Sequence, residues 1–403
     1  MRERKRATVR DLRRDNRYVL LTSLFFDQPR GRQELGEATG LSPGSISNVT
    51  RGLMREGIVV EAGSADPDGR RPRTLLQINP DHGYVIGVDV GETRVLVELF
   101  DLMMTERAKA DLSLIPREHD LGAIVDAVVA GVDAVLASAG VDRSRVLGVG
   151  VGVPGTVEYG PEAVVHGQSF GWESAPLEHL LRSATGLPLD IDNSAKTMGQ
   201  AEMWFGAGRG TQHAVVCLIG SGVGASIITN GHTQRDSSSS AGEWGHTTVA
   251  VGGRLCRCGS RGCLEAYVGS DAILDRCGLP SLGDDRESAL GALLNSYGTS
   301  REATRVLDDT ALYLGAGMAN LINLFNPERI ILGGWTGLLL GERLLPAIRS
   351  AARQHSLRHP FAGLSIELGR FGPDAVALGA ASLPLERILG LRGPASLGPP
   401  ISR

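Results

Sequence analysis

Apolar residues recur at helical spacing in three successive segments near the start of the chain. The segment "NRYVLLTSLFFD" (residues 16–27) places its apolar side chains close to helical spacing, and the pattern ends before Pro29. The segment "RQELGEATG" predicts a shorter second helix that ends at Gly40. A third helix is predicted in "LSPGSISNVTRGLMREG", with Ser42 as its N-cap and Gly57 as its stop.

The third predicted helix has two different faces. Its apolar stripe consists of Ile46, Val49, Leu53 and Met54. Small hydrogen-bonding side chains and one arginine turn away from that stripe, as the recognition of base edges and phosphates in a DNA major groove requires. These candidate DNA-binding residues are Ser45, Ser47, Asn48 and Arg51. The third helix is therefore predicted to be a recognition helix.

Two predicted strands, "IVVEAG" and "RTLLQIN", follow this helix and are joined by "SADPDGRRP". The joining segment and the start of the second strand contribute Arg70, Arg71 and Arg73, which a wing would direct at phosphates or a minor groove. The pattern resembles the winged-helix heads of bacterial transcriptional regulators. The alternative is a domain of three helices that serves only for packing and whose basic loop is exposed to solvent without contacting DNA.

From Gly83 onwards the pattern changes to apolar strands and glycine turns. The segment "YVIGVDVGETRVLVELFD" predicts a β-hairpin with Asp89 at its tip, and "HAVVCLIGSGVGASIITNG" predicts a second one. The segments "RVLGVGVGVPGTV" and "PERIILGGWTG" predict further glycine-rich strands. Two glycine turns that face each other are what a nucleotide cleft between two lobes requires, because bare backbone N–H groups can approach phosphates. Taken alone, however, the glycines of each turn could serve only to close a tight hairpin.

Length, composition and charge limit the class of protein. A chain of 403 residues with 42% hydrophobic residues predicts two or three soluble globular domains. No apolar run approaches about 20 residues, and the basic start lacks the apolar stretch of a signal peptide, so we expect a cytoplasmic protein without membrane contact. Residues 1–80 contain 15 Lys and Arg against 10 Asp and Glu, whereas the remainder has a net charge of −9. A basic head on an acidic body favours a polyanionic partner, here operator DNA.

Three of the five cysteines lie within eight residues, in "CRCGSRGC". The sequence offers Cys256, Cys258 and Cys263, and His246 precedes them by ten residues. Three thiolates and one imidazole can form a tetrahedral zinc site without an open position, which is the form of a structural site. Free thiols or a disulfide are the alternative, although three neighbouring cysteines cannot pair evenly.

These motifs, together with "SSAGEWGHTTV", resemble the ROK family of repressors, open reading frames and sugar kinases. The resemblance covers nearly the whole chain and is greatest to the repressor branch, including its xylose and N-acetylglucosamine repressors. It implies an α/β fold in which a winged helix-turn-helix head (residues 1–80) precedes a two-lobed, actin-like domain. We expect a small lobe over residues 81–192 plus about 372–390, a large lobe over 193–371 with the zinc site, and a disordered tail over 391–403.

The resemblance also implies roles for individual residues. The family's zinc motif matches His246, Cys256, Cys258 and Cys263, so we predict all four as ligands of one structural Zn²⁺. The sugar-binding residues implied are Asn193, Ser194, Glu243, His246 and Glu265. The alternatives are that Glu243 is a solvated acid and that His246 is a metal ligand only.

Two departures from the family's kinases predict a site without catalysis. In those kinases an aspartate follows the asparagine and takes the proton from the sugar hydroxyl, whereas here Ser194 follows Asn193 at the end of the strand "LPLDIDN". A serine hydroxyl is not a base near pH 7, and loss of a positioned base costs about 10²–10⁴ in rate. The first phosphate loop reads "DVGETR", so Glu92 occupies a glycine position and would repel a nucleotide. A Ser194–Lys196 nucleophile pair is an alternative, but no oxyanion motif accompanies it.

The sequence therefore predicts a sugar-responsive transcriptional regulator, most simply a repressor, that acts as a homodimer or homotetramer. Sugar would close the cleft and change the spacing of two heads, with a hinge over residues 79–84. One rival is a bifunctional, ATP-dependent sugar kinase that uses Asp190 or Asp192 as its base. The other is a DNA-binding protein whose effector is a phosphorylated sugar or a protein.

Overall fold

The head of the molecule combines three helices with a small antiparallel sheet. The computed structural model describes residues 9–65, 73–115, 120–234, 240–279 and 286–391. The helices are α1 (Val9–Asp27), α2 (Arg32–Thr39) and α3 (Pro43–Arg55), and the sheet has the order β1 (Arg30–Gly31), β3 (Arg73–Ile78), β2 (Val59–Ala65). All three predicted helices and both predicted strands are present, although the first helix begins at Val9 rather than at Asn16.

Local signals in the sequence fix the ends of the head helices. The Ser42 hydroxyl accepts a hydrogen bond from the Ser45 N–H at 3.2 Å, which caps α3, and Pro43 occupies its first turn. Gly40 follows the end of α2 and Gly57 follows the end of α3. Their φ angles are 69° and 76°, a region that glycine enters without strain. The predicted caps and stops are therefore confirmed.

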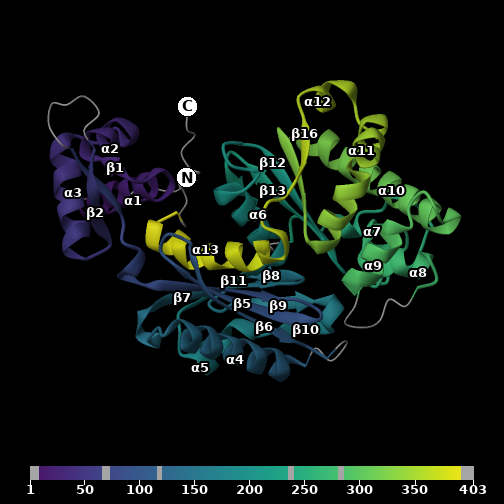
Figure 1. The fold of residues 1–403 in the computed structure, drawn as a ribbon, viewed down its shortest axis with the longest axis horizontal. Helices are drawn as coiled ribbons and strands as arrows, with labels where there is room; N and C mark the ends of the chain where they lie inside the picture. The colour runs from purple at the N-terminus through teal and green to yellow at the C-terminus, as the bar shows by residue number, and fades with distance from the viewer. Residues whose placement is uncertain (1–8, 66–72, 116–119, 235–239, 280–285, 392–403) are drawn as a thin grey trace, which may run out of the picture.

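The first lobe of the body is a five-stranded mixed sheet with helices on both faces. Its strand order is β11 (Leu189–Asn193), β7 (Val146–Val153), β4 (Tyr84–Val90), β5 (Arg94–Asp101), β6 (Glu106–Ser113). The helices α4 (Leu121–Ala139) and α5 (Leu177–Thr185) cover one face, and α13 (Ala375–Leu389) crosses the other (Figure 1). A small sheet of β8 (Thr156–Glu158), β9 (Val164–Gly167) and β10 (Trp172–Ala175) adjoins this lobe.

The second lobe contains a similar five-stranded sheet. Its order is β14 (His232–Thr233), β13 (Val223–Thr229), β12 (Ala214–Ile219), β15 (Arg329–Gly333), β16 (Ser365–Leu368). The long helices α10 (Arg301–Phe325) and α11 (Trp335–His355) pack against each other beside this sheet, with α7 (Glu265–Val268), α8 (Ser270–Arg276), α9 (Arg286–Asn295) and α12 (Arg358–Ala362) around them (Figure 1). Both predicted hairpins are confirmed, because β4 pairs with β5 and β12 pairs with β13 in antiparallel register.

Helix α6 (Ser194–Phe205) lies between the two sheets. It contacts β7 and β11 of the first lobe as well as β12 and β13 of the second, and it packs along α13. Ten consecutive residues of α6, from Ala195 to Trp204, are buried. A helix that is buried all round cannot shift without disturbing both lobes. Its position therefore makes α6 a mechanical link within the body.

The head packs directly on the body through aromatic side chains. Phe25 and Phe26 of α1 form edge-to-face contacts with Trp204 of α6, with ring centroids 5.8 and 5.2 Å apart, and Phe205 adjoins them. We call Phe25, Phe26, Trp204 and Phe205 the interdomain aromatic cluster. The predicted hinge contains a short 3₁₀ helix, Pro80–His82, and its Asn79 side chain donates to the Gly57 carbonyl at 2.9 Å. These contacts order the segment predicted as the hinge, and its role as a hinge stays a prediction.

One helix of the body has the length and composition of a membrane span. Helix α4 meets both criteria over its 19 residues. The expectation that no segment of the chain approaches this length is thus wrong. In the structure, Ile124, Val128 and Val132 of α4 are fully buried, and the helix packs on β5 and β6. Its apolar character is accounted for by the sheet that it covers.

Candidate functional site

A cavity of about 540 Å³ opens between the two lobes. The first lobe contributes the β4–β5 turn and the segment after Pro154, and the second lobe contributes the turn from Gly220 to Gly224. The two predicted glycine turns thus face one cavity, as their pattern indicated. His166 and Gln168 also line it. A space of this size between two lobes is sufficient for a small-molecule ligand.

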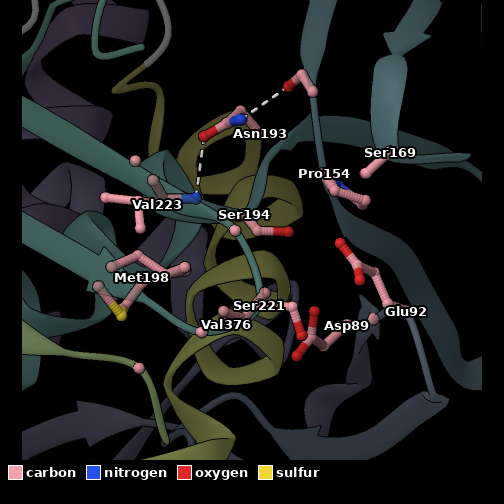
Figure 2. Close-up of a pocket in the computed structure, with 18 of the residues that line it drawn as sticks. Asp89, Glu92, Pro154, Ser169, Asn193, Ser194, Met198, Ser221, Val223 and Val376 are labelled. Atoms are coloured by element: carbon pink, nitrogen blue, oxygen red, sulfur yellow. Dashed lines mark hydrogen bonds between the residues drawn. The ribbon is translucent and has the colours of Figure 1, made fainter. Parts of the chain in front are cut away.

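Strand β11 delivers its polar end to the wall of this cavity. Asn193 is the N-cap of α6, because its Oδ1 accepts hydrogen bonds from the N–H groups of Ala195 (2.9 Å) and Lys196 (3.2 Å). Its Nδ2 donates to the Gly155 carbonyl at 2.7 Å (Figure 2). The Asn193 amide therefore holds the cavity wall together as well as lining it.

Ser194 is the first residue of α6 and also lines the cavity. Figure 2 shows its hydroxyl and the Glu92 carboxylate directed into the same open space. The helix starts at once after strand β11. Because residues two apart on a helix point in different directions, Ser194 does not form a nucleophile pair with Lys196, and Lys196 is 3% exposed.

Three acidic or imidazole side chains predicted to bind sugar meet at the opposite wall. Glu243 directly precedes the 3₁₀ turn Trp244–His246, His246 is its last residue, and Glu265 begins α7; all three line the cavity. Burial raises the pKa of Glu243 above its usual range, while His246 and Lys196 counteract the rise. Glu265 is buried, and its Oε2 accepts a hydrogen bond from the Val223 N–H at 3.0 Å. The structure thus brings all five predicted sugar-binding residues to one cavity.

The acids proposed for a kinase base lie elsewhere. Asp190 forms an ion pair with Arg387 at 3.2 Å, and Asp192 is fully buried; neither is among the described residues that line the cavity. Asp89, at the end of β4, does line it. Burial raises the pKa of Asp89 to about 7, a rise that Arg94 reduces and Asp111 reinforces. Asp89 is therefore an acid with a raised pKa on the side of the first glycine turn, as Glu243 is on the opposite wall.

The predicted metal ligands converge beside this wall. The ligand atoms of His246, Cys256, Cys258 and Cys263 all lie within 4.8 Å of one another. The Cys258 and Cys263 sulfur atoms are 3.7 Å apart, and the Cys256 sulfur is 3.7 Å from His246 Nδ1. Zinc–sulfur bonds of about 2.3 Å give a tetrahedron whose edges are about 3.8 Å, so the spacing fits a metal of this kind. His246 belongs to both this cluster and the cavity.

An arginine inside the cysteine segment forms an ion-pair bridge that the sequence analysis missed. Arg257 Nη1 lies 2.6 Å from Glu92 Oε1, and Arg257 Nε lies 2.8 Å from Glu265 Oε1. Arg286 adds a longer contact, 3.7 Å from its Nη1 to Glu92 Oε2. The acid at Glu92 was the one hint in the sequence, but only its burial in the fold makes a neighbouring cation necessary.

The candidate DNA-binding residues lie on the head with different degrees of exposure. Asn48 and Arg51 are exposed on α3, whereas Ser45 and Ser47 are half-buried. The Ser45 hydroxyl lies 3.0 Å from that of Ser42, so it takes part in the helix cap. Arg73 is exposed at the start of β3, and Arg70 and Arg71 fall outside the described residues, as does most of the predicted tail (residues 392–403).

Comparison with known proteins places this architecture in a family. The ROK family model matches residues 85–387. The chain belongs to the ROK family. This confirms the resemblance inferred from the glycine turns and the cysteine motif, and with it the actin-like, two-lobed α/β fold.

Relatives with and without a head both match this ROK chain. It is 29% identical to the xylose repressor of Caldicellulosiruptor bescii over 94% of this chain and 97% of the relative. It is 32% identical to a glucokinase of Halalkalibacterium halodurans, but over 74% of this chain and 94% of that enzyme. A crystal structure of a ROK family transcriptional regulator, a homologue of the E. coli MLC protein, covers 94% of this chain and 98% of its own with a TM-score of 0.78 and 25% identity. The repressor and regulator matches thus extend over almost the whole of both chains.

Proposed function

We propose that this ROK protein is a DNA-binding transcriptional repressor whose body binds a sugar without phosphorylating it. The observation that carries the proposal is the path of α6, which begins at Ser194 on the cavity wall and ends in the interdomain aromatic cluster beneath the head. A ligand that moves the start of this buried helix also moves the surface on which the head rests. The full-length similarity to xylose repressors supports the same function.

Sugar binding and DNA binding are linked in this proposal through two states of the cleft. Sugar favours the closed state by its difference in affinity for the two states, and α6 carries the motion to α1. A homodimer or homotetramer presents two heads at a spacing that matches two operator half-sites, and a change in their spacing alters DNA affinity. A DNA-binding protein of this kind acts in the cytoplasm.

The His246–Cys256–Cys258–Cys263 cluster is proposed to hold a structural Zn²⁺. Three thiolates and one imidazole satisfy a tetrahedral ion, leaving no position for an activated water. The ion would fix the segment that carries Arg257 and leads into Glu265, and it would hold the ring of His246 against the cavity. The metal would thus order the sugar-binding wall rather than take part in a reaction.

A sugar kinase is the second candidate, favoured by the similarity to glucokinase. Against it, Ser194 occupies the proposed position of the base, and Glu92 with Arg257 fills the space at the first glycine turn. We expect no phosphoryl transfer from γ-³²P-ATP to any of a panel of pentoses and hexoses, because loss of the base alone costs about 10²–10⁴ in rate. Metabolic turnover that is abolished by Asp89→Asn would establish the kinase instead.

The recognition surface gives a prediction for DNA binding. Replacing Arg51 by alanine is expected to weaken operator binding about 10- to 100-fold and to reduce the salt dependence by about one counterion, because an exposed guanidinium on α3 is lost. Fluorescence anisotropy at several salt concentrations measures both quantities. Arg353→Ala, which removes an exposed arginine from α11 in the body, is the matched control. Equal affinities for the two variants would remove α3 from the DNA interface.

Footprinting tests the whole function. The protein is incubated with DNA from upstream of its own gene and of neighbouring genes, with and without each sugar of the panel. We expect a protected site of two similar half-sites, with protection that changes for one sugar. Absence of any protected site would refute the repressor function, whereas protection that no sugar changes would refute the sugar response.

A further inference from the structure

The ion-pair bridge across the cleft determines which ligands the cavity accepts. Glu92 lies in the β4–β5 turn of the first lobe, while Arg257 and Arg286 belong to the second lobe. The side chains of Glu92, Glu265 and Arg286 are 15%, 7% and 11% exposed, whereas that of Arg257 is 36% exposed, so the two acids are shielded and the guanidinium that joins them is partly open to water. Removing the cation therefore leaves two shielded carboxylates without compensation.

The bridge occupies the space between the two glycine turns. A Cβ atom at Gly222 would lie 2.8 Å from Arg257 Nη2, so the second turn approaches the guanidinium closely because it has no side chain. From the first turn, Glu92 contacts the same guanidinium. The place where two such turns would hold phosphate oxygens is therefore filled by an internal carboxylate and its arginine.

Every arginine among the described residues of the cavity wall is already paired with an acid. Arg94 contacts Asp111 at 2.8 Å, Arg286 contacts Asp271 at 3.4 Å, and Arg257 contacts both Glu92 and Glu265. The wall also carries Asp89, Glu243 and Glu287. Acids thus outnumber arginines on the described wall, and a phosphate ester would meet repulsion without an available guanidinium.

Neutral hydroxyl groups meet a favourable surface instead. The hydroxyls of a sugar donate to carboxylate oxygens and accept from N–H groups, and they cost little to desolvate compared with a phosphate of charge −1.5 to −2. We infer that the effector is a neutral, unphosphorylated monosaccharide, and that the Glu92–Arg257 pair is the specificity determinant that excludes phosphate esters. This inference rests on the proposed sugar-binding function and narrows its ligand class.

Calorimetric titration of the full chain tests this discrimination. The ligands are the neutral pentoses and hexoses, the phosphate ester of each, and inorganic phosphate. We expect the wild-type protein to bind one neutral sugar at least about 100-fold more tightly than its ester, because like charges in a shielded site are strongly disfavoured. Glu92→Gln removes one carboxylate that pairs with Arg257 and Arg286. It is therefore expected to lower the ratio of sugar affinity to ester affinity at least tenfold and to allow inorganic phosphate to bind in the cavity.

Two further variants complete the test. Glu342→Gln removes the same charge from an exposed position on α11, outside the described cavity wall, and is expected to leave the ratio of sugar affinity to ester affinity unchanged. Arg257→Gln removes the cation and keeps Glu92 and Glu265, so it is expected to raise the ratio of sugar affinity to ester affinity. This variant tests the inference even if Glu92→Gln does not fold. Thermal melting establishes that each variant is folded.

The outcomes separate this inference from the proposed function. If an ester binds as tightly as its parent sugar, or if Glu92→Gln and Arg257→Gln both leave the ratio unchanged, the specificity role of the bridge is refuted, while a sugar-dependent repressor remains possible. If no sugar or ester binds the wild-type protein, the inference and the sugar-binding function are refuted together.

Discussion

Replacing Cys256 by serine is expected to abolish binding of the proposed Zn²⁺ and to weaken sugar binding about 100-fold, because misplacing binding groups by about 1 Å has effects of this size. Cys256 is buried, and it precedes Arg257 directly. Loss of the zinc would free the segment that holds Arg257 and Glu265 in place. Metal content by mass spectrometry of the native protein and sugar affinity by calorimetry measure the two effects.

Cys277→Ser is the matched control for this prediction. Cys277 is a half-buried free cysteine outside the four-ligand cluster, so its replacement is expected to change neither metal content nor sugar affinity. Chelation of the wild-type protein should reproduce the Cys256→Ser result, and added Zn²⁺ should reverse it. A Cys256→Ser variant that keeps one equivalent of zinc, or that loses zinc and binds sugar normally, would contradict the proposed role of the cluster.

Replacing Trp204 by alanine is expected to disconnect the sugar from DNA binding. The substitution removes the ring that both Phe25 and Phe26 contact, at the end of α6 farthest from the cavity. The factor by which sugar changes operator affinity, typically about 5–150 in allosteric proteins, should fall towards 1. Stability should also fall by about 3–5 kcal/mol, since a large buried side chain is truncated.

The control for this effect is Phe361→Ala. Phe361 is a partly buried aromatic residue of α12 that packs against the core of the second lobe, away from the head. It should lower stability but preserve the coupling factor. Because reciprocal coupling is a thermodynamic requirement, operator DNA should alter sugar affinity by the same factor in the wild-type protein and have no effect in Trp204→Ala. A variant that folds and retains full coupling would rule out the interdomain aromatic cluster as the route.

The parts of the fold that depend on local signals could be predicted from the sequence. Ser42, Gly40 and Gly57 act through the few residues around them, and the glycine turns of both hairpins likewise need only their own segments. The spacing of the cysteines placed their sulfur atoms near one another for the same reason. These predictions are correct because each depends only on the conformation of a few neighbouring residues.

The parts that depend on distant contacts could not be predicted in this way. The Glu92–Arg257 pair joins residues 165 positions apart, and each of them alone is compatible with a solvated surface. Phe25 and Phe26 matched the apolar pattern of a helix, but no local feature indicated that their partners would be Trp204 and Phe205 in another domain. The contact between head and body therefore could not be predicted from the helix pattern.

The segment around the end of β11 depends partly on local signals and partly on distant contacts. The alternation up to Asn193 correctly predicted a strand with a polar end, and Asn193 is a favourable N-cap. The immediate start of α6 was missed, because the buried positions of this helix occupy all of its faces and give no amphipathic signal. Burial between two sheets is a property of the assembled fold and not of the segment.

The proposed response to sugar depends on one link, from the cavity through α6 to the head. This link is tested most directly by titrating fluorescent operator DNA with the wild-type protein in the presence and absence of the neutral sugar that the protein binds, without ATP. We expect operator affinity to change about fivefold or more, in the typical range of allosteric coupling. Identical titration curves at saturating sugar would contradict it.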